Sequence, residues 1–329
     1  ARAGRFCLAI LAGIDEAGFG PVLGPLVVSA AAFEVPDDRL DGCLWETLAG
    51  AVRRRPTRKR QGVAIADSKL LYGGARNGSL EHLERGVLSM LATRDGPTGS
   101  FVELLERIGP AAAKSMKGYA WYAEAQLDLP GSVTKTDVAL CGRALGAAME
   151  RAGVRLLDLR CEPILVGEYN RMVEATDNKA LTLLGVTGRL VDHVWRRTKG
   201  GPMRIVVDRQ GGRSRYQPWL RQILPRTRLK IIDETSQRST YRVEDGKRSA
   251  EMVFAVGAEE QCLASALASM ASKYVRELFM SMLNRYWTSR VPGLTGTGGY
   301  FADGKRFLAA IRPAAEEMGV DERLLCRIR

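Results

Sequence analysis

The chain has 329 residues, 46% of them hydrophobic, which is enough to bury a sizeable core in one large domain or two ordinary ones. Its 49 Lys and Arg against 37 Asp and Glu give a net charge of +12, which favours a polyanionic partner, the alternative being a surface charged only for solubility. With only two histidines, a zinc site or a Ser-His-Asp triad is not expected, so chemistry would fall to carboxylates, Lys, Tyr or a hard metal.

The six cysteines are scattered and form no C-x-x-C pair, which is typical of reduced residues in a cytoplasmic protein. No apolar run reaches the length of a membrane span. We therefore expect a cytoplasmic protein without membrane contact, and we expect it to be a monomer.

Two apolar runs near the start predict buried strands. Residues 6–14 are apolar without interruption, and residues 25–34 form the second run. Pro21 and Gly24 lie between the runs and indicate a turn. Residues 52–60 then carry six basic residues, a pattern typical either of a solvated loop or of an arm that contacts phosphate.

The middle of the chain has helical periodicity. Helices are predicted over residues 79–92 (with Ser79 as the N-cap), 101–118, 138–153 and 179–198. Residues 203–208 (MRIVVD) follow as a short run rich in β-branched residues. This run predicts a buried strand with Asp208 at its C-terminal end.

The last third begins with strands and ends with a long helix. Residues 228–257 suggest a series of strands, with a turn at Asp245-Gly246. Residues 259–287 form the longest predicted helix, whose apolar residues recur every three or four positions: Leu263, Leu267, Met270, Tyr274, Leu278 and Met282. Strands followed by long helices predict an α/β fold.

Acidic residues at the ends of these elements are the candidates for chemistry. Asp15 and Glu16 end the first strand, Asp208 ends another, and Glu277 lies in the long helix four residues after Lys273. Neighbouring strand residues point to opposite faces, so two adjacent acids share a site only where the chain turns, and the residues after Glu16 supply that turn. Four such carboxylates could hold two Mg²⁺ or Mn²⁺ ions roughly 3.5–4 Å apart. An Asp-Glu pair is equally typical of a solvated turn, and Lys273 could simply pair with Glu277 along the helix.

A resemblance to a known family bears on this choice. GIDEAGFGPVLGP (13–25) resembles the G-x-D-E-A-G-R-G-P-x-x-G-P signature of ribonuclease HII, the type 2 ribonuclease H family. The family's other motifs are matched in the same order by ADSKLL (66–71), NKALTLLGVTGRLVDHVW (178–195), IVVDR (205–209), ASALASMASKYVRE (264–277) and TGTGGYFADGKRF (295–307).

The resemblance implies a ribonuclease H-like fold, a five-stranded mixed sheet flanked by helices. It implies that the metal ligands and catalytic residues are Asp15, Glu16, Asp208 and Glu277. It also implies substrate contacts from the loop Gly18–Phe19–Gly20 and from Ser68, Lys69 and Tyr300, and Lys273 is a further candidate beside the metal site. The implied substrate is an RNA–DNA hybrid or a duplex that contains ribonucleotides.

The sequence departs from the family at informative positions. Phe19 replaces the arginine that reads a ribonucleotide at a junction with DNA, which puts the cutting of single embedded ribonucleotides in doubt. Glu277 stands where the family has Asp, and Arg209 follows the third acid where the family has Gly. The sister family, ribonuclease HIII, also uses Glu at the fourth position and lacks the arginine.

We expect a single catalytic domain over residues 1–329, with insertions near 95–175 and 225–256 and a C-terminal helical segment over 259–329. The first functional hypothesis is an endoribonuclease that cuts the RNA strand of RNA–DNA hybrids with two metal ions. Two alternatives remain open on the sequence: a nucleic-acid-binding protein of the same fold with little or no catalysis, and a DNA nuclease on the same scaffold. The contact to the 2′-hydroxyl that would decide is not visible in the sequence.

Overall fold

The computed structural model describes residues 8–56, 62–73, 78–124, 126–197 and 200–328. The strands are β1 (Leu8–Ala17), β2 (Leu26–Pro36), β3 (Val52–Arg53), β4 (Val63–Ala64), β5 (Arg155–Ile164), β6 (Gly201–Asp208), β7 (Arg228–Glu234), β8 (Arg238–Glu244) and β9 (Arg248–Ala255). The helices are α1 (Leu44–Thr47), α2 (Ser68–Tyr72), α3 (Glu81–Asp95), α4 (Phe101–Ile108), α5 (Pro110–Ser115), α6 (Ala120–Ala123), α7 (Lys135–Ala152), α8 (Val166–Thr176), α9 (Lys179–Arg197), α10 (Gln217–Ile223), α11 (Ala258–Gln261), α12 (Leu263–Thr288), α13 (Phe301–Glu317) and α14 (Glu322–Leu325).

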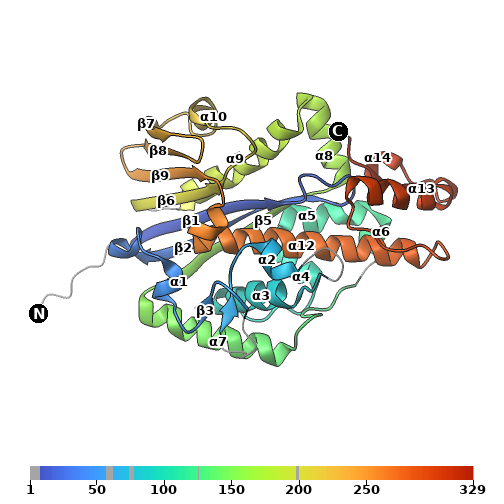
Figure 1. The fold of residues 1–329 in the computed structure, drawn as a ribbon, viewed down its shortest axis with the longest axis horizontal. Coiled ribbons are helices and arrows are strands. Elements are labelled where there is room, and N and C mark those ends of the chain that lie inside the picture. The colour runs from blue at the N-terminus through green and yellow to red at the C-terminus, as the bar shows by residue number, and fades with distance from the viewer. Residues whose placement is uncertain (1–7, 57–61, 74–77, 125, 198–199, 329) are drawn as a thin grey trace, which may run out of the picture.

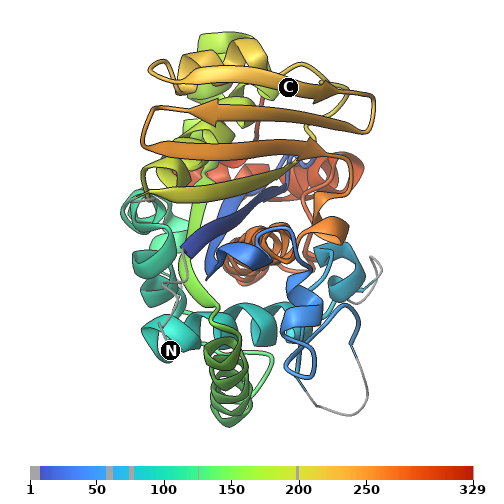
Figure 2. The same ribbon diagram turned by 90° about the vertical axis from the view of Figure 1, so that its left-hand side faces the viewer.

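A mixed sheet of seven strands forms the centre of the molecule, in the order β5-β2-β1-β6-β9-β8-β7. β1 pairs antiparallel to β2, which pairs antiparallel to β5, whereas β6 runs parallel to β1 and β9 runs parallel to β6. These five strands make the expected mixed sheet. The expected count of five is wrong, because β8 and β7 continue the sheet beyond β9 by antiparallel pairing. Figure 2 shows how strongly the sheet twists from β5 to β7.

Helices cover both faces of this sheet (Figure 1). Alternate residues of β1 are buried in different cores: Ala9 and Leu11 pack with α12, α3 and α4, whereas Ile10, Ala12 and Ile14 pack with α9 and α10. A strand buried on both faces has no polar side, which is why β1 is an uninterrupted apolar run. The prediction of an α/β fold with a mixed sheet between helices is confirmed.

The long helix α12 lies unusually close to β1. A Cβ atom at Gly13 would sit 1.9 Å from the backbone nitrogen of Ser265, so only glycine fits there. Ser265 and Ser272 on α12 donate hydrogen bonds to the carbonyl oxygens of Val206 and Asp15. Small residues on α12 therefore set the distance between this helix and the strands β1 and β6, whose C-terminal parts carry the acids.

Local breakers explain where the helices depart from the predicted ranges. The predicted helix over 101–118 divides after Ile108, because Gly109 leaves the helical conformation (φ −144°, ψ 54°) and Pro110 starts α5. The helix predicted over 259–287 likewise divides at Cys262, which separates α11 from α12. Of the basic run 52–60, residues 57–60 lie outside the described residues.

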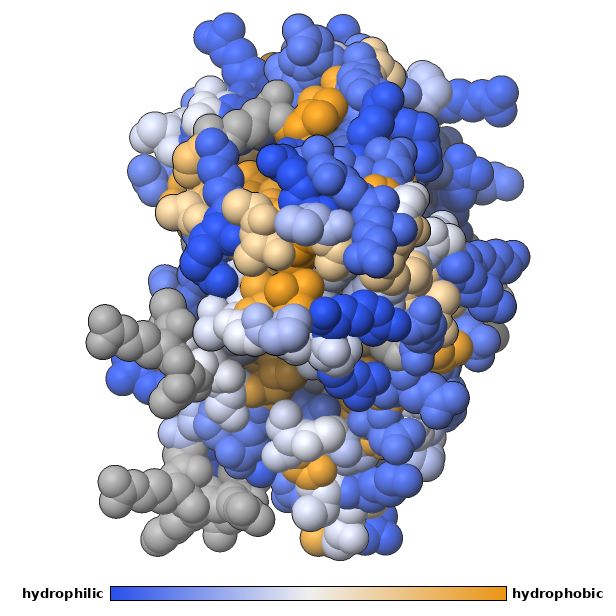
Figure 3. Space-filling model, turned by 90° about the vertical axis from the view of Figure 1, so that its right-hand side faces the viewer, coloured by the Kyte–Doolittle hydropathy of each residue, from blue (hydrophilic) through white to orange (hydrophobic). Residues whose placement is uncertain are grey.

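The surface at the end where α13 and α14 lie is mostly hydrophilic, with hydrophobic side chains between the polar ones (Figure 3). Among the described residues no helix is long and apolar enough to cross a membrane. Cysteines 43, 141, 161, 262 and 326 are all free thiols.

Candidate active site

Three acids meet where β1 and β6 end side by side. Ile14 pairs with Val207 in the parallel register, so the next residues, Asp15 and Asp208, are neighbours across the two strands. Carboxylate oxygens of Asp15, Glu16 and Asp208 all lie within 4.8 Å of one another. The sequence predicted a turn directly after Glu16, but β1 continues to Ala17. The pairing of β1 with β6 ends at Ile14 and Val207, so Asp15 and Glu16 follow directly after the last paired residue of β1 on that side.

Burial and mutual repulsion raise the pKa of each acid. Burial and the charges of Glu16 and Asp208 raise the pKa of Asp15 well above its usual value, against a hydrogen bond from Ser269. Burial and the charge of Asp208 raise the pKa of Glu16 to about 7, although Lys69 opposes the rise. Burial also raises the pKa of Asp208, against a backbone hydrogen bond from Ala258. Such a cluster is costly unless a cation shares it.

A fourth acid, Glu259 on α11, belongs with this group. Its charge raises the pKa of both Asp15 and Glu16, and its own pKa is raised by burial and by Asp208. The Oε2 atom of Glu259 is buried and has no hydrogen-bond partner among the described residues. α11 follows β9, and β9 runs parallel to β6, so the C-terminal ends of both strands lie at one edge of the sheet. Sequence reasoning missed Glu259; the signal was an acid just after a predicted strand.

Glu277 lies elsewhere, so the geometry does not support its expected place among the metal ligands. Its carboxylate accepts hydrogen bonds from Lys273 Nζ and Arg276 Nη1, each at 2.8 Å, and from the Tyr72 hydroxyl at 3.0 Å. Burial opposes ionisation, but Arg276 and Lys273 outweigh it and lower the pKa of Glu277. Glu277 comes eight residues after Ser269 on α12, which is about 12 Å along the helix axis. Because Ser269 is the α12 residue that contacts Asp15, Glu277 lies beyond the acid cluster along this helix. Its visible role is to join α2 to α12.

The predicted substrate residues fall into different places. Lys69 is exposed, and its pKa is raised by Asp67, Glu259 and the clustered acids, although partial burial opposes the rise. Ser68 is buried, and its hydroxyl lies 3.0 Å from that of Ser269, the residue that is hydrogen-bonded to Asp15, so Ser68 acts on the site through Ser269. Lys273 is occupied by Glu277 and by the ring of Tyr72, 4.2 Å away.

Tyr300 is 58% exposed and lies with its ring 6.0 Å from the Arg276 guanidinium. Arg276 in turn donates to Glu277 and to the backbone carbonyl of Gly298. Tyr300 therefore lies near Arg276 and Glu277, and its exposed side chain is accessible to a ligand there.

The loop after β1 is held from the C-terminal end of the chain. Arg327 is buried and donates to the carbonyl oxygens of Gly18, Pro21 and Gly24. Gly18 has φ +84°, and a Cβ there would lie 2.5 Å from Nε of Arg276, so glycine is required. Phe19 is half-buried, and Gly20 has open space around it. The loop is thus fixed beside the acids with Phe19 at its tip.

These acids fit a divalent metal site. The donor set is all carboxylate, which suits Mg²⁺ or Mn²⁺. The repulsion that raises the pKa of Asp15 and Glu16, and the buried oxygen of Glu259 without a partner, are what a cation would relieve. The residues that would hold it are Asp15, Glu16, Asp208 and Glu259.

No protein-family model and no curated protein matches the sequence. Similar solved structures include the ribonuclease HII of Archaeoglobus fulgidus in a complex with PCNA (14% identity, 97% of this chain and 94% of that chain covered, TM-score 0.43). They also include the ribonuclease H2 of Pyrococcus horikoshii OT3 (13%, 96% and 92%, 0.41) and Bst-RNase HIII with Mn²⁺ (15%, 98% and 68%, 0.44). These solved structures, to which the fold of this chain is similar, are a ribonuclease HII, a ribonuclease H2 and a ribonuclease HIII.

Proposed function

We propose that this chain is a metal-dependent endonuclease of the type 2 ribonuclease H family, which hydrolyses the RNA strand of RNA–DNA hybrids. The observation that carries the proposal is the meeting of Asp15, Glu16 and Asp208 at the ends of two parallel strands, with Glu259 beside them. The ion pairs of the described residues include none to Asp15, Glu16, Asp208 or Glu259, and Lys69 lowers the pKa of Glu16, Asp208 and Glu259 without neutralising the cluster.

Each residue of the site has a role in this proposal. Divalent ions, when bound, supply activation of the attacking water and stabilisation of the charge that develops on the phosphodiester. Asp15, held by Ser269, and Asp208, held by Ala258 N–H, keep fixed positions on rigid strands. Lys69 is exposed beside the acids and would orient a phosphate oxygen of the backbone.

The choice of substrate rests on two supports. The net charge of +12 favours a polyanion. The signature at residues 13–25 and the order of the other motifs resemble a family that acts on RNA paired to DNA. Carboxylate and metal chemistry does not itself distinguish ribose from deoxyribose, because the 2′-hydroxyl must be recognised by a separate contact.

The test is cleavage of end-labelled duplexes with Mg²⁺ or Mn²⁺. The substrates are an RNA–DNA hybrid, a DNA duplex with one embedded ribonucleotide, and plain DNA. We expect cutting of the hybrid, with little at the single ribonucleotide because Phe19 replaces an arginine. Cutting of plain DNA would favour the DNA-nuclease alternative. Tight binding of the hybrid without cutting in either metal would favour a binding protein without catalysis.

A further inference from the structure

A hollow of about 520 Å³ opens directly beside the acid cluster, and Glu16 is part of its wall. The Phe19 ring and Leu183 from α9 give it an apolar side, and the segment from Gln210 to Arg215 gives it a polar side. Its volume is within the range of pockets that enclose small organic ligands. Because Glu16 belongs to both, a group in this hollow would adjoin the position of the cleaved phosphate.

The polar side of the hollow is a firmly built loop. The guanidinium of Arg209 donates to the backbone carbonyl oxygens of Gly212 and Arg213, and to that of Ser236 at the start of the β8 hairpin. The Gln210 N–H donates to the Tyr216 hydroxyl. The position where the related family has Gly thus carries an arginine that shapes the loop, so the hollow does not depend on a mobile segment.

Positive charge without a partner gathers around the hollow. The side chains of Arg213 and Arg215 make no ion pair or hydrogen bond within the described part of the chain. Lys179 Nζ lies 5.3 Å from the centre of the Phe19 ring. Three cations beside an acidic site are suited to an anionic group that arrives with the substrate.

The remaining features favour a flat, polar ring in the same place. The half-buried ring of Phe19 provides an aromatic surface, and aromatic side chains stack on bases of any sequence. Gln210 Nε2 donates to Thr187 Oγ1 at 2.6 Å, whereas its Oε1 is buried with no hydrogen-bond partner among the described residues. A base N–H group is a donor of the kind that this oxygen lacks.

We propose that the hollow holds one unpaired nucleotide next to the cleaved phosphate, with its base against Phe19 and its phosphate on Arg213 and Arg215. The inference rests on the proposed nuclease function and adds to it a preference for hybrids that carry an unpaired nucleotide over fully paired ones. In a fully paired hybrid, the base must first break its pairing and stacking, which costs free energy. A nucleotide in a bulge is already unpaired, so this cost is smaller.

The experiment compares binding of two hybrids, one fully paired and one with a single unpaired nucleotide beside the expected cut, by fluorescence anisotropy in an Asp208→Asn background. We expect the bulged hybrid to bind about tenfold more tightly. Phe19→Leu keeps an apolar side chain on the core but removes the ring, so the preference should fall to about twofold or less. No preference, or one that survives Phe19→Leu, would overturn the proposal.

A charge-matched pair of double variants tests the arginines. Arg213→Ala/Arg215→Ala should weaken binding of the bulged hybrid about tenfold and reduce the slope of log K against log salt by about 1–2. The control is Arg143→Ala/Arg151→Ala, two exposed arginines of α7 without partners in the described structure. Equal losses in both double variants would mean that only net charge acts, and the proposal would fail.

Cleavage by the otherwise unmodified protein separates this inference from the proposed function. If the hybrid is cut but the bulge is not preferred, the nucleotide pocket is wrong and the nuclease stands. If the bulge is preferred through Phe19 but neither hybrid is cut, the nuclease proposal fails and the pocket stands. Absence of binding to both hybrids would overturn both.

Discussion

At the scale of single residues, two partly buried glutamates, Glu259 on α11 and Glu277 on α12, have opposite surroundings. Glu277 has two cations and a tyrosine hydroxyl on its carboxylate. Glu259 has an oxygen without a partner and stands among other acids. A carboxylate already neutralised by Lys and Arg has little left to offer a metal, whereas one surrounded by acids gains from it.

This contrast predicts different outcomes for two matched variants. Glu259→Gln should lower the rate of hybrid cleavage about 100-fold and weaken the dependence on Mn²⁺, with stability nearly unchanged. Glu277→Gln should lower the free energy of unfolding by about 2 kcal/mol, because Lys273 and Arg276 lose their counterion, and should leave the Mn²⁺ dependence as it was. Cleavage rates across a Mn²⁺ titration and denaturant unfolding check both. A larger effect on Mn²⁺ dependence from Glu277→Gln would restore it as the ligand.

Gly13 gives a second prediction at this scale. Gly13→Ala should lower the free energy of unfolding by about 3 kcal/mol or prevent folding, because the new Cβ meets the backbone of Ser265 and α12 must move away from β1. Gly20→Ala is the matched control, since a Cβ there meets nothing within 4 Å. Urea unfolding of the two variants is the measurement. Equal stability of both would contradict the close packing of α12 on β1.

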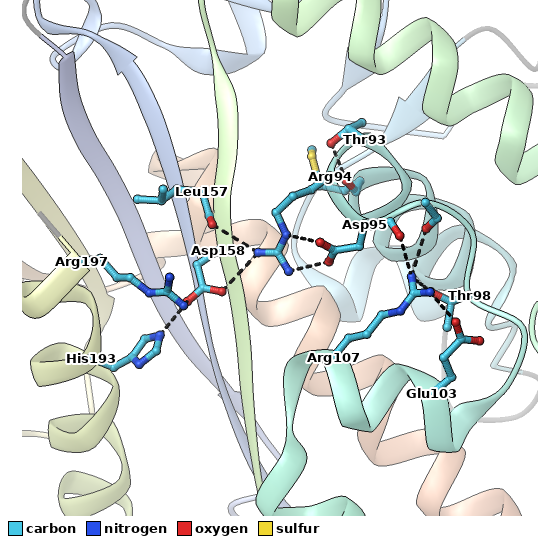
Figure 4. Close-up of polar contacts among 12 residues, drawn as sticks. Thr93, Arg94, Asp95, Thr98, Glu103, Arg107, Leu157, Asp158, His193 and Arg197 are labelled. Atoms are coloured by element: carbon cyan, nitrogen blue, oxygen red, sulfur yellow. Dashed lines mark hydrogen bonds and ion pairs between the residues drawn. The ribbon is translucent and has the colours of Figure 1, made fainter.

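At the scale of elements, Asp158 on the edge strand β5 joins the two helical layers (Figure 4). On one side of the sheet, its carboxylate pairs with Arg94 of α3 at 3.2 Å. On the other side, it pairs with His193 of α9 at 2.6 Å and with Arg197 of the same helix at 3.1 Å. Burial opposes ionisation, but the hydrogen bond from His193 and the charges of Arg197 and Arg94 outweigh it, so the pKa of Asp158 is lowered.

A carboxylate with a lowered pKa stabilises the fold above its unfolded pKa, about 3.9, and loses that contribution as pH falls through the folded value. Asp158→Asn should therefore cost about 2 kcal/mol of unfolding free energy at pH 6–7. The difference between wild type and variant should shrink below about pH 4. Denaturant unfolding from pH 7 to pH 3 measures it, and a difference that stays constant across this range would mean that the ionised carboxylate is not what matters.

The elements differ in how far the sequence could predict them. β1, β6 and α9 were visible because their apolar runs and periodicity follow from burial of whole faces. The β7–β8 strands were also visible, but their addition to the main sheet was not, because edge pairing is decided by tertiary contacts rather than by strand propensity. Likewise Asp15 and Asp208 followed from strand ends, whereas Glu259 required knowing that β9 lies parallel to β6.

At the scale of the whole molecule, the sheet places the acids at one edge and lets both helical layers support them. α12 fixes β1 and β6 from one face through its serines, and the C-terminal Arg327 fixes the loop that follows β1. The insertion expected near 225–256 includes β9, whose end leads into Glu259, so that region contributes to the candidate site itself. Whether residues 1–329 fold as one unit stays a prediction.

The most direct measurement is cleavage of an RNA–DNA hybrid by the wild type and by Asp208→Asn, with Mg²⁺ or Mn²⁺ and with a chelator. We expect the wild type to cut the hybrid and to stop cutting when the chelator is added. Asp208→Asn should cut about 1,000-fold more slowly, with hybrid binding within about twofold of wild type. Cutting by Asp208→Asn at the wild-type rate, or cutting by the wild type in the presence of the chelator, would contradict it.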